Sequence, residues 1–178
     1  DISHYQKNSK QENTLKELYR EINRNKRSPS IRNFQENYEL GAIPLYAAIE
    51  VASFGTISKM YKNMKNTDKK EIANVFGVHY IYLESWIENL AYVRNICAHY
   101  GRLYGAKLTK TPKLYKDCLD RGVSNNTIFA SILNLSILSE EEHYHRFYVA
   151  LLQTIKKYPS VDLKHLGFVK DWEQLLCR

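Results

Sequence analysis

Residues 79–101 read HYIYLESWIENLAYVRNICAHYG, and the apolar side chains in this stretch recur at the spacing of helix turns. They form one stripe, made of Leu83, Trp86, Ile87, Leu90, Val93 and Cys97. Such a stripe predicts an amphipathic helix over about 79–100 that packs on a core. Gly101 follows the last apolar turn, where we expect it to supply the left-handed cap that ends the helix.

A second long helix is expected upstream, over about 42–65. Pro44 opens it, because proline is favoured in the first turn of a helix. Its first half, AIPLYAAIEVASFG, is apolar nearly all round, as in a buried helix. The helices at 42–65 and 79–100 are therefore expected at the centre of the bundle.

Shorter elements complete the chain. We expect further helices at about 11–25, 67–77, 126–138 and 140–157, and a short one near the C-terminus that holds Trp172. Ser139 is the expected N-cap of the helix at 140–157. The KRSPSIRNF stretch at 26–34 is typical of a basic linker, and residues 101–125 of a basic loop. No stretch predicts a strand, so the sequence predicts an all-α bundle in one domain, 1–178.

Charge and cysteine content limit the partners and the compartment. Lys and Arg number 26 against 19 Asp and Glu, and a net charge of +7 favours a polyanionic partner, nucleic acid before membrane. Three cysteines without metal-ligand spacing favour reduced thiols in a cytosol. No apolar run approaches the roughly 20 residues that cross a bilayer. We expect a cytoplasmic protein with no membrane partner, no metal and no cofactor.

The chemistry is expected at the end of the 79–100 helix. Asn95 and His99 are four residues apart and share a helix face, and Arg94 precedes them. Cleavage of RNA without a metal needs an acid and a base for proton transfer and a cation for the phosphoryl oxygens. Histidine and arginine suit these tasks, and asparagine can orient the imidazole. By spacing alone, these residues are more often helix caps and ion-pair partners than a catalytic centre.

A family resemblance adds to this interpretation. RN-x-x-x-H resembles the Arg-x4-His motif of the HEPN superfamily of helical ribonucleases, and RNICAHYGRLYG (94–105) resembles its Abi-like (abortive-infection) branch. Other segments resemble that branch in the same order: IPLYAAIEVASFGTISKMY (43–61), SWIENLAYVRN (85–95), Pro112 and GFVKDWEQL (167–175). The resemblance spans nearly the whole chain, although the N-terminal portion of the family is expected to be missing before Asp1.

The resemblance implies a function. It implies a HEPN-like helical bundle that acts as a metal-independent endoribonuclease toxin and leaves 2′,3′-cyclic phosphate ends. Phage defence by abortive infection or a toxin–antitoxin pair is the implied setting, with RNA as the substrate and an inhibitory RNA as a further partner. HEPN domains typically pair two motifs across one groove, so a homodimer is implied as well.

Further site residues are expected around the motif. Glu50 lies in a run with almost no other charge, so we expect a buried carboxylate that either positions Arg94 or His99 or forms a structural pair. The cations that follow the motif either track an RNA backbone or face solvent: Arg102, Lys107, Lys110, Lys113 and Lys116. Tyr100 and Tyr104 either stack on bases or pack on the protein.

Two other classes of protein fit the same residues. In a non-catalytic binding module, Arg94 and His99 hold RNA or a partner protein without cleavage. In a structural helical adaptor, the basic stretch beside the motif has no role in RNA binding. The complete set of motif residues favours the enzyme over both.

Overall fold

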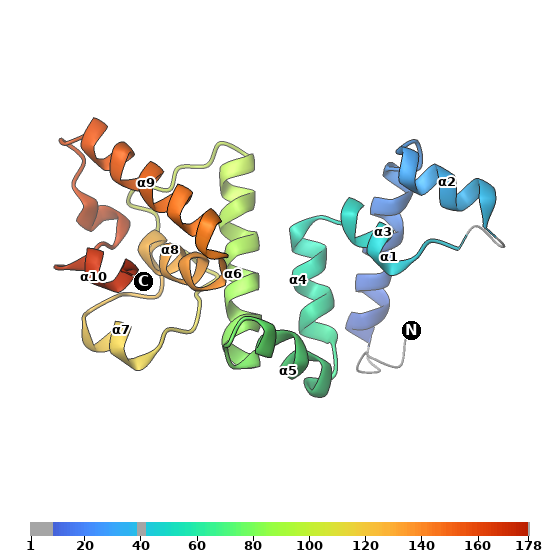
Figure 1. Ribbon diagram of the computed structural model, residues 1–178, viewed down its shortest axis with the longest axis horizontal. Helices are drawn as coiled ribbons and strands as arrows, with labels where there is room; N and C mark the ends of the chain where they lie inside the picture. Colours follow the sequence, from blue (N-terminus) through green and yellow to red (C-terminus); the bar gives the residue numbers. More distant parts are fainter. Residues whose placement is uncertain (1–8, 39–41, 178) are drawn as a thin grey trace. The chain divides into compact units, whose positions relative to one another are not determined.

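The computed structural model describes residues 9–38 and 42–177, which contain helices and no strand. The all-α prediction is therefore confirmed (Figure 1). The helices in chain order are α1 (Ser9–Arg24), α2 (Pro29–Asn37), α3 (Leu45–Val51), α4 (Phe54–Asn63), α5 (Asn66–Val75), α6 (Tyr80–Ala98), α7 (Lys116–Asp120), α8 (Ile128–Leu138), α9 (Glu141–Lys157), the 3-10 helix η3 (Leu163–Leu166) and α10 (Trp172–Leu176).

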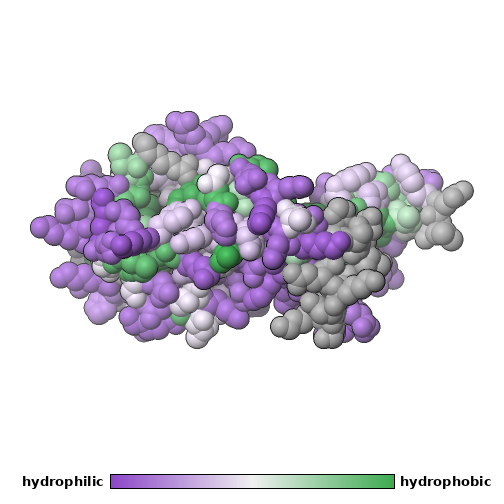
Figure 2. Space-filling model, turned by 90° about the horizontal axis from the view of Figure 1, so that it is seen from below, coloured by the Kyte–Doolittle hydropathy of each residue, from purple (hydrophilic) through white to green (hydrophobic). Residues whose placement is uncertain are grey.

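The chain divides into two compact units, Asp1–Ile72 and Ala73–Arg178. The prediction of a single domain is not tested by this division and stays a prediction. On the face drawn in Figure 2, most side chains are hydrophilic (purple) and apolar side chains (green) gather in smaller patches. This pattern is expected when the apolar stripes of the helices are largely used in the cores.

The first unit is built on α1, which packs against α4 and α3. Its core is a cluster of buried apolar side chains from α1 to α4: Leu18, Ile22, Ile31, Ala48 and Met60. The prediction of a linker at 26–34 is wrong, because α2 begins at Pro29 and buries Ile31 and Phe34 on one face. Ser28 and Pro29 are in fact a helix start, since proline at the first helical position is preset for the helix.

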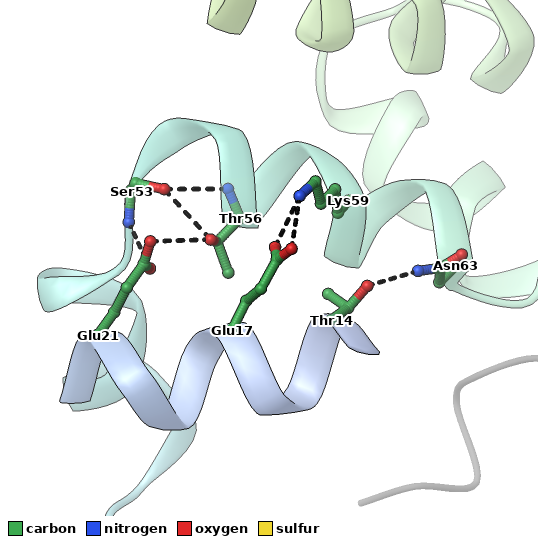
Figure 3. A network of polar contacts seen from close by, with 7 residues as sticks. All are labelled: Thr14, Glu17, Glu21, Ser53, Thr56, Lys59 and Asn63. Carbon is green, nitrogen blue, oxygen red and sulfur yellow. Dashed lines mark hydrogen bonds and ion pairs between the residues drawn. The ribbon is translucent and has the colours of Figure 1, made fainter. Parts of the chain in front are cut away.

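The prediction of one continuous helix over 42–65 is also wrong, because the chain breaks between α3 and α4. Ser53 has extended backbone angles and N-caps α4, and its hydroxyl accepts from the Thr56 amide at 3.2 Å. Glu21 of α1 accepts from the Ser53 amide at 2.8 Å and from the Thr56 hydroxyl at 3.0 Å (Figure 3). These bonds satisfy donors at the new helix start, which offsets the cost of interrupting the helix.

Glu21 is held as a carboxylate by the same contacts. Burial raises the pKa of Glu21, but the hydrogen bonds from Ser53 and Thr56 and the charge of Arg24 outweigh it and lower the pKa below its ordinary value. The same face of α1 carries two more contacts to α4. Glu17 pairs with Lys59 at 2.7 Å, and Thr14 accepts from the Asn63 amide at 2.9 Å. Three contacts spaced by one helix turn fix the register between α1 and α4.

The second unit carries the larger core. Helix α8 packs against α6, and α10 packs against α8 (Figure 1). Phe129 of α8 is fully buried and lies against Phe168 at 4.6 Å between ring centroids. The helices predicted at 126–138 and 140–157 are confirmed as α8 and α9.

Two details of the second unit differ from the sequence predictions. Glu140 rather than Ser139 is the N-cap of α9, because the Ser139 hydroxyl donates to the Leu135 carbonyl at 2.7 Å and so serves the end of α8. The short helix α7 interrupts the loop predicted at 101–125.

Candidate active site

Helix α6 positions the motif because its middle is anchored in the second unit. The side chains of Leu83, Trp86 and Asn89 are fully or almost fully buried. The last turn of α6 leaves this packing, so Cys97 is exposed and its predicted place in the apolar stripe is wrong. The motif residues therefore lie at the solvated end of a helix whose other turns are fixed.

The structure brings Arg94, Asn95 and His99 together at that end. All three side chains are exposed, and Arg94 Nη1 donates to Asn95 Oδ1 at 3.3 Å. His99 lies one turn after Asn95, and its amide donates to the Asn95 carbonyl at 3.1 Å. A cation, an amide and an imidazole thus lie exposed within the last turns of one helix.

The end of α6 is a Schellman motif centred on Tyr100. The Tyr100 amide donates to the Cys97 carbonyl at 3.1 Å, and the Gly101 amide donates to the Ile96 carbonyl at 2.7 Å. Gly101 was expected to be the left-handed residue, but Tyr100 takes that conformation, with φ at 55°. Glycine is needed at 101 for a different reason: a Cβ there would lie 2.6 Å from Ile96 Cγ2.

Tyr100 is an unusual residue for this position. A left-handed conformation costs a residue with a Cβ about 1–2 kcal/mol, and Tyr100 is 98% exposed, so packing of its ring does not offset that cost. The ring therefore projects into solvent directly after His99. Strain of this kind clusters at functional sites, and an exposed aromatic ring suits base stacking.

Replacing Tyr100 separates the effect of its backbone strain from the effect of its exposed ring. Tyr100→Gly should raise the free energy of unfolding by about 1 kcal/mol relative to Tyr100→Ala, because only glycine removes the left-handed strain. Both variants should weaken RNA binding by the same factor, because both remove the ring. Urea unfolding and fluorescence anisotropy with labelled RNA measure the two effects. Equal stability of the glycine and alanine variants would contradict the strain.

The chain after the motif folds back onto η3. Arg102 Nε donates to the Tyr104 carbonyl at 3.0 Å, and the Gly105 amide donates to the His165 carbonyl at 3.1 Å. The Tyr104 ring lies 5.3 Å from the His165 imidazole between centroids. The structure therefore brings a second histidine to the loop that carries two predicted RNA-binding residues. Nothing in the sequence around His165 indicates this contact, because it joins residues 60 positions apart.

The basic segment, residues 107–113, runs along α6 toward the start of that helix. Asn89 Nδ2 donates to the Lys110 carbonyl at 2.7 Å, and Trp86 Nε1 donates to the Lys113 carbonyl at 2.6 Å. Later residues of the segment thus bind earlier residues of α6, so the two run antiparallel. Trp86 and Asn89 were not predicted as site residues, although a buried asparagine in an apolar stripe indicates a partner of this kind.

The cations of the basic segment are not equivalent. Lys107 and Lys113 are exposed. Lys110 is paired with Glu88 at 3.0 Å between Nζ and Oε1, with its side chain 55% exposed. An exposed ion pair is weak, about 0–1 kcal/mol, but it lowers the charge that Lys110 offers to a phosphate. Lys107 and Lys113 are therefore the stronger candidates for RNA contact.

The prediction for Glu50 was based on a burial that the structure does not have. Glu50 lies near the end of α3 in the first unit, and its side chain is exposed. A solvated carboxylate needs no partner, so the expectation that Glu50 is a buried carboxylate in need of one is wrong. A role for Glu50 beside the motif of the second unit stays a prediction.

Comparison with known proteins places this site in a family. The family model described as Abi-like protein matches residues 1–105, which is more than half of the chain and includes Arg94, Asn95 and His99. No curated protein and no solved structure matches the chain. Within residues 9–38 and 42–177, no helix combines the length and the apolar character needed to cross a membrane. The chain belongs to the Abi-like protein family, and this membership indicates a part in abortive infection, a defence against phage.

Proposed function

We propose that the chain is a metal-independent endoribonuclease of the HEPN type that acts as an RNA-cleaving toxin in abortive infection or in a toxin–antitoxin pair. One observation supports this most directly. Arg94, Asn95 and His99 share the exposed end of α6, and the Schellman motif fixes the backbone that carries His99. Membership of the Abi-like family gives this arrangement its biological setting.

In the proposed reaction, the 2′ oxygen of a ribose attacks the adjacent phosphodiester of the same RNA strand. A base takes the proton of the 2′-OH, the 2′ oxygen attacks phosphorus, and the bond from phosphorus to the 5′ oxygen breaks. An acid then protonates the leaving 5′ oxygen, so the products are a 2′,3′-cyclic phosphate and a 5′-OH. His99 serves one proton transfer, because imidazole exchanges protons near neutral pH.

Arg94 is proposed to stabilise the charge that gathers on the phosphoryl oxygens. A guanidinium offers five donors in a planar fork, and Arg94 gives one of them to Asn95 Oδ1 at 3.3 Å. The others can grip a phosphate while Asn95 limits the rotation of the side chain. Asn95 therefore acts as a positioning residue for Arg94, and its amide N–H groups can also donate to the phosphate.

A second proton-transfer group is proposed to come from a second copy of the chain. Acid and base roles need two groups, and the motif supplies one imidazole. The three motif side chains are exposed, as expected for half of a site that another subunit covers. A homodimer related by a two-fold axis would face one His99 with another across a shared groove.

Arg94 provides the test of the proposed function. Wild-type protein should cleave total RNA in excess EDTA, and Arg94→Ala should weaken both RNA affinity and cleavage, because the cation contributes to binding and to the transition state. Arg94→Lys is the matched control: it keeps the charge and should restore affinity more than cleavage, since a lysine lacks the fork. Tight RNA binding by the wild type without any cleavage would instead support the non-catalytic binding module.

A further inference from the structure

An open pocket of about 640 Å³ lies at the opposite end of α6 from the motif. It belongs entirely to the second unit, and its lining includes His79, Tyr82, Lys113 and Asn125. Pockets of several hundred Å³ are the usual size for small organic ligands. The lining combines aromatic rings, a cation and an amide with the aliphatic side chains of Ile81, Leu114 and Leu119. The proposed reaction assigns a task to none of His79, Tyr82 and Asn125.

The aromatic wall of the pocket is held in place by stacking. The Tyr82 ring lies 4.7 Å from the Tyr115 ring with 26° between the planes, and Trp86 meets both rings edge-on. Trp86 is itself fully buried and anchored by its hydrogen bond to the Lys113 carbonyl. Tyr82 is thus a rigid platform whose ring loses little freedom when another flat ring stacks on it.

The polar side of the pocket is equally well fixed. Both backbone groups of Lys113 are bound, because its amide donates to Ser85 Oγ at 3.0 Å and its carbonyl accepts from Trp86. The lysine side chain is exposed at the rim, where a phosphate can approach it. Asn125 adds an exposed amide with both a donor and an acceptor, the groups that read the edge of a base.

We infer that this pocket is a nucleobase subsite that holds one unstacked base of a single-stranded RNA, with Lys113 on the adjoining phosphate. The inference deepens the proposed function and rests on it, since the same RNA strand would reach the motif. Single-stranded RNA fits better than a duplex, because only an unpaired base can leave its stack and enter a pocket.

The basic segment lies along the helix that separates the two places. It runs antiparallel to α6, from Lys110 beside Asn89 to Lys113 at the pocket. Helix α6 has 19 residues, which at 1.5 Å per residue is about 28 Å. A strand stacked as in a duplex advances about 3.4 Å per nucleotide, so about eight stacked nucleotides span the length of α6. RNA affinity should therefore increase with oligonucleotide length until both places are reached.

The test measures how the affinity for RNA depends on length. Single-stranded oligonucleotides of about 4 and about 12 nucleotides, lengths that bracket this span, are titrated by anisotropy onto the full chain with His99→Ala. Tyr82→Leu removes the platform and Tyr82→Phe keeps it. Lys113→Ala removes the rim cation, and Lys170→Ala is its matched control on an exposed lysine outside the pocket lining. Circular dichroism verifies the fold. His79 N-caps α6, and its Nδ1 accepts from the Ile81 amide at 3.4 Å. His79→Asn, which keeps an acceptor for this cap, replaces Tyr82→Leu if that variant unfolds.

The long oligonucleotide should bind the parent protein tighter than the short one. Tyr82→Leu should cut affinity for the long one by about tenfold, the loss of one stacked base, while Tyr82→Phe and Lys170→Ala keep it. Length-dependent binding unchanged by Tyr82→Leu, His79→Asn and Lys113→Ala would overturn the subsite. Length-dependent binding that needs Tyr82, in a protein with His99 that does not cleave RNA, would keep the subsite and reject the ribonuclease. If the protein cleaves RNA and the pocket variants leave its RNA affinity unchanged, the subsite is rejected and the ribonuclease is kept.

Discussion

His99→Ala should lower the rate of RNA cleavage by about 10²–10⁴-fold, the usual contribution of a positioned proton-transfer group. RNA affinity should change by only a few-fold, because the cations that bind phosphate remain. The cap of α6 should also remain, since His99 takes part through its backbone and its side chain is exposed. Single-turnover cleavage of labelled RNA and anisotropy with the same RNA measure the two quantities separately.

The matched control is His143→Ala. His143 is an exposed histidine on α9, where its imidazole lies 3.9 Å from Glu140. Its replacement should leave cleavage unchanged, which separates a specific role of His99 from a general effect of losing an imidazole. A His99→Ala protein that still cleaves RNA at close to the wild-type rate would remove His99 from the chemistry.

Excess His99→Ala protein should poison the activity of the wild type by more than simple dilution. If two chains share one site, each mixed dimer keeps a single imidazole in its groove. At a fourfold excess of the variant, only about one wild-type chain in five pairs with another wild-type chain. Activity per wild-type chain should therefore fall about fivefold once subunit exchange has been verified by energy transfer between labelled chains.

Activity that falls only with the wild-type fraction would show that each chain carries a complete site. His165 is then the group to replace, because the Gly105 amide and the Tyr104 ring hold it beside the loop that follows the motif. In that outcome His165→Ala should reduce cleavage as strongly as His99→Ala. If the mixing experiment shows a shared site and His165→Ala still lowers activity, His165 has a role in RNA binding instead.

The long helices could be predicted because their patterns are local. Periodic apolar residues define α6, α8 and α9, and the structure places them within a few residues of the expected bounds. The break at Ser53 could not be predicted in the same way. Ser53 lies in an apolar run that continues the helical pattern, and its amide is satisfied by Glu21, 32 residues earlier. The spacing of apolar residues cannot show where a long-range cap interrupts a helix.

The candidate site was predictable only in part, for a similar reason. Arg94, Asn95 and His99 are close in sequence, so their spacing alone places them on the same helix end. The residues that hold the surrounding loops act across long stretches of chain, from Trp86 to Lys113 and from Gly105 to His165. Exposure cannot be read from sequence either, since Glu50 lies in an apolar run and is still solvated.

The ends that cleavage leaves on RNA test the central claim most directly. Purified wild-type protein is incubated with RNA in excess EDTA, beside His99→Ala, and the product termini are identified by mass spectrometry. Attack by the 2′ oxygen requires a 2′,3′-cyclic phosphate on one fragment and a 5′-OH on the other, formed by the wild type and not by the variant. Fragments with 3′-OH and 5′-phosphate ends, or cleavage that appears only when Mg²⁺ is added, would contradict the account.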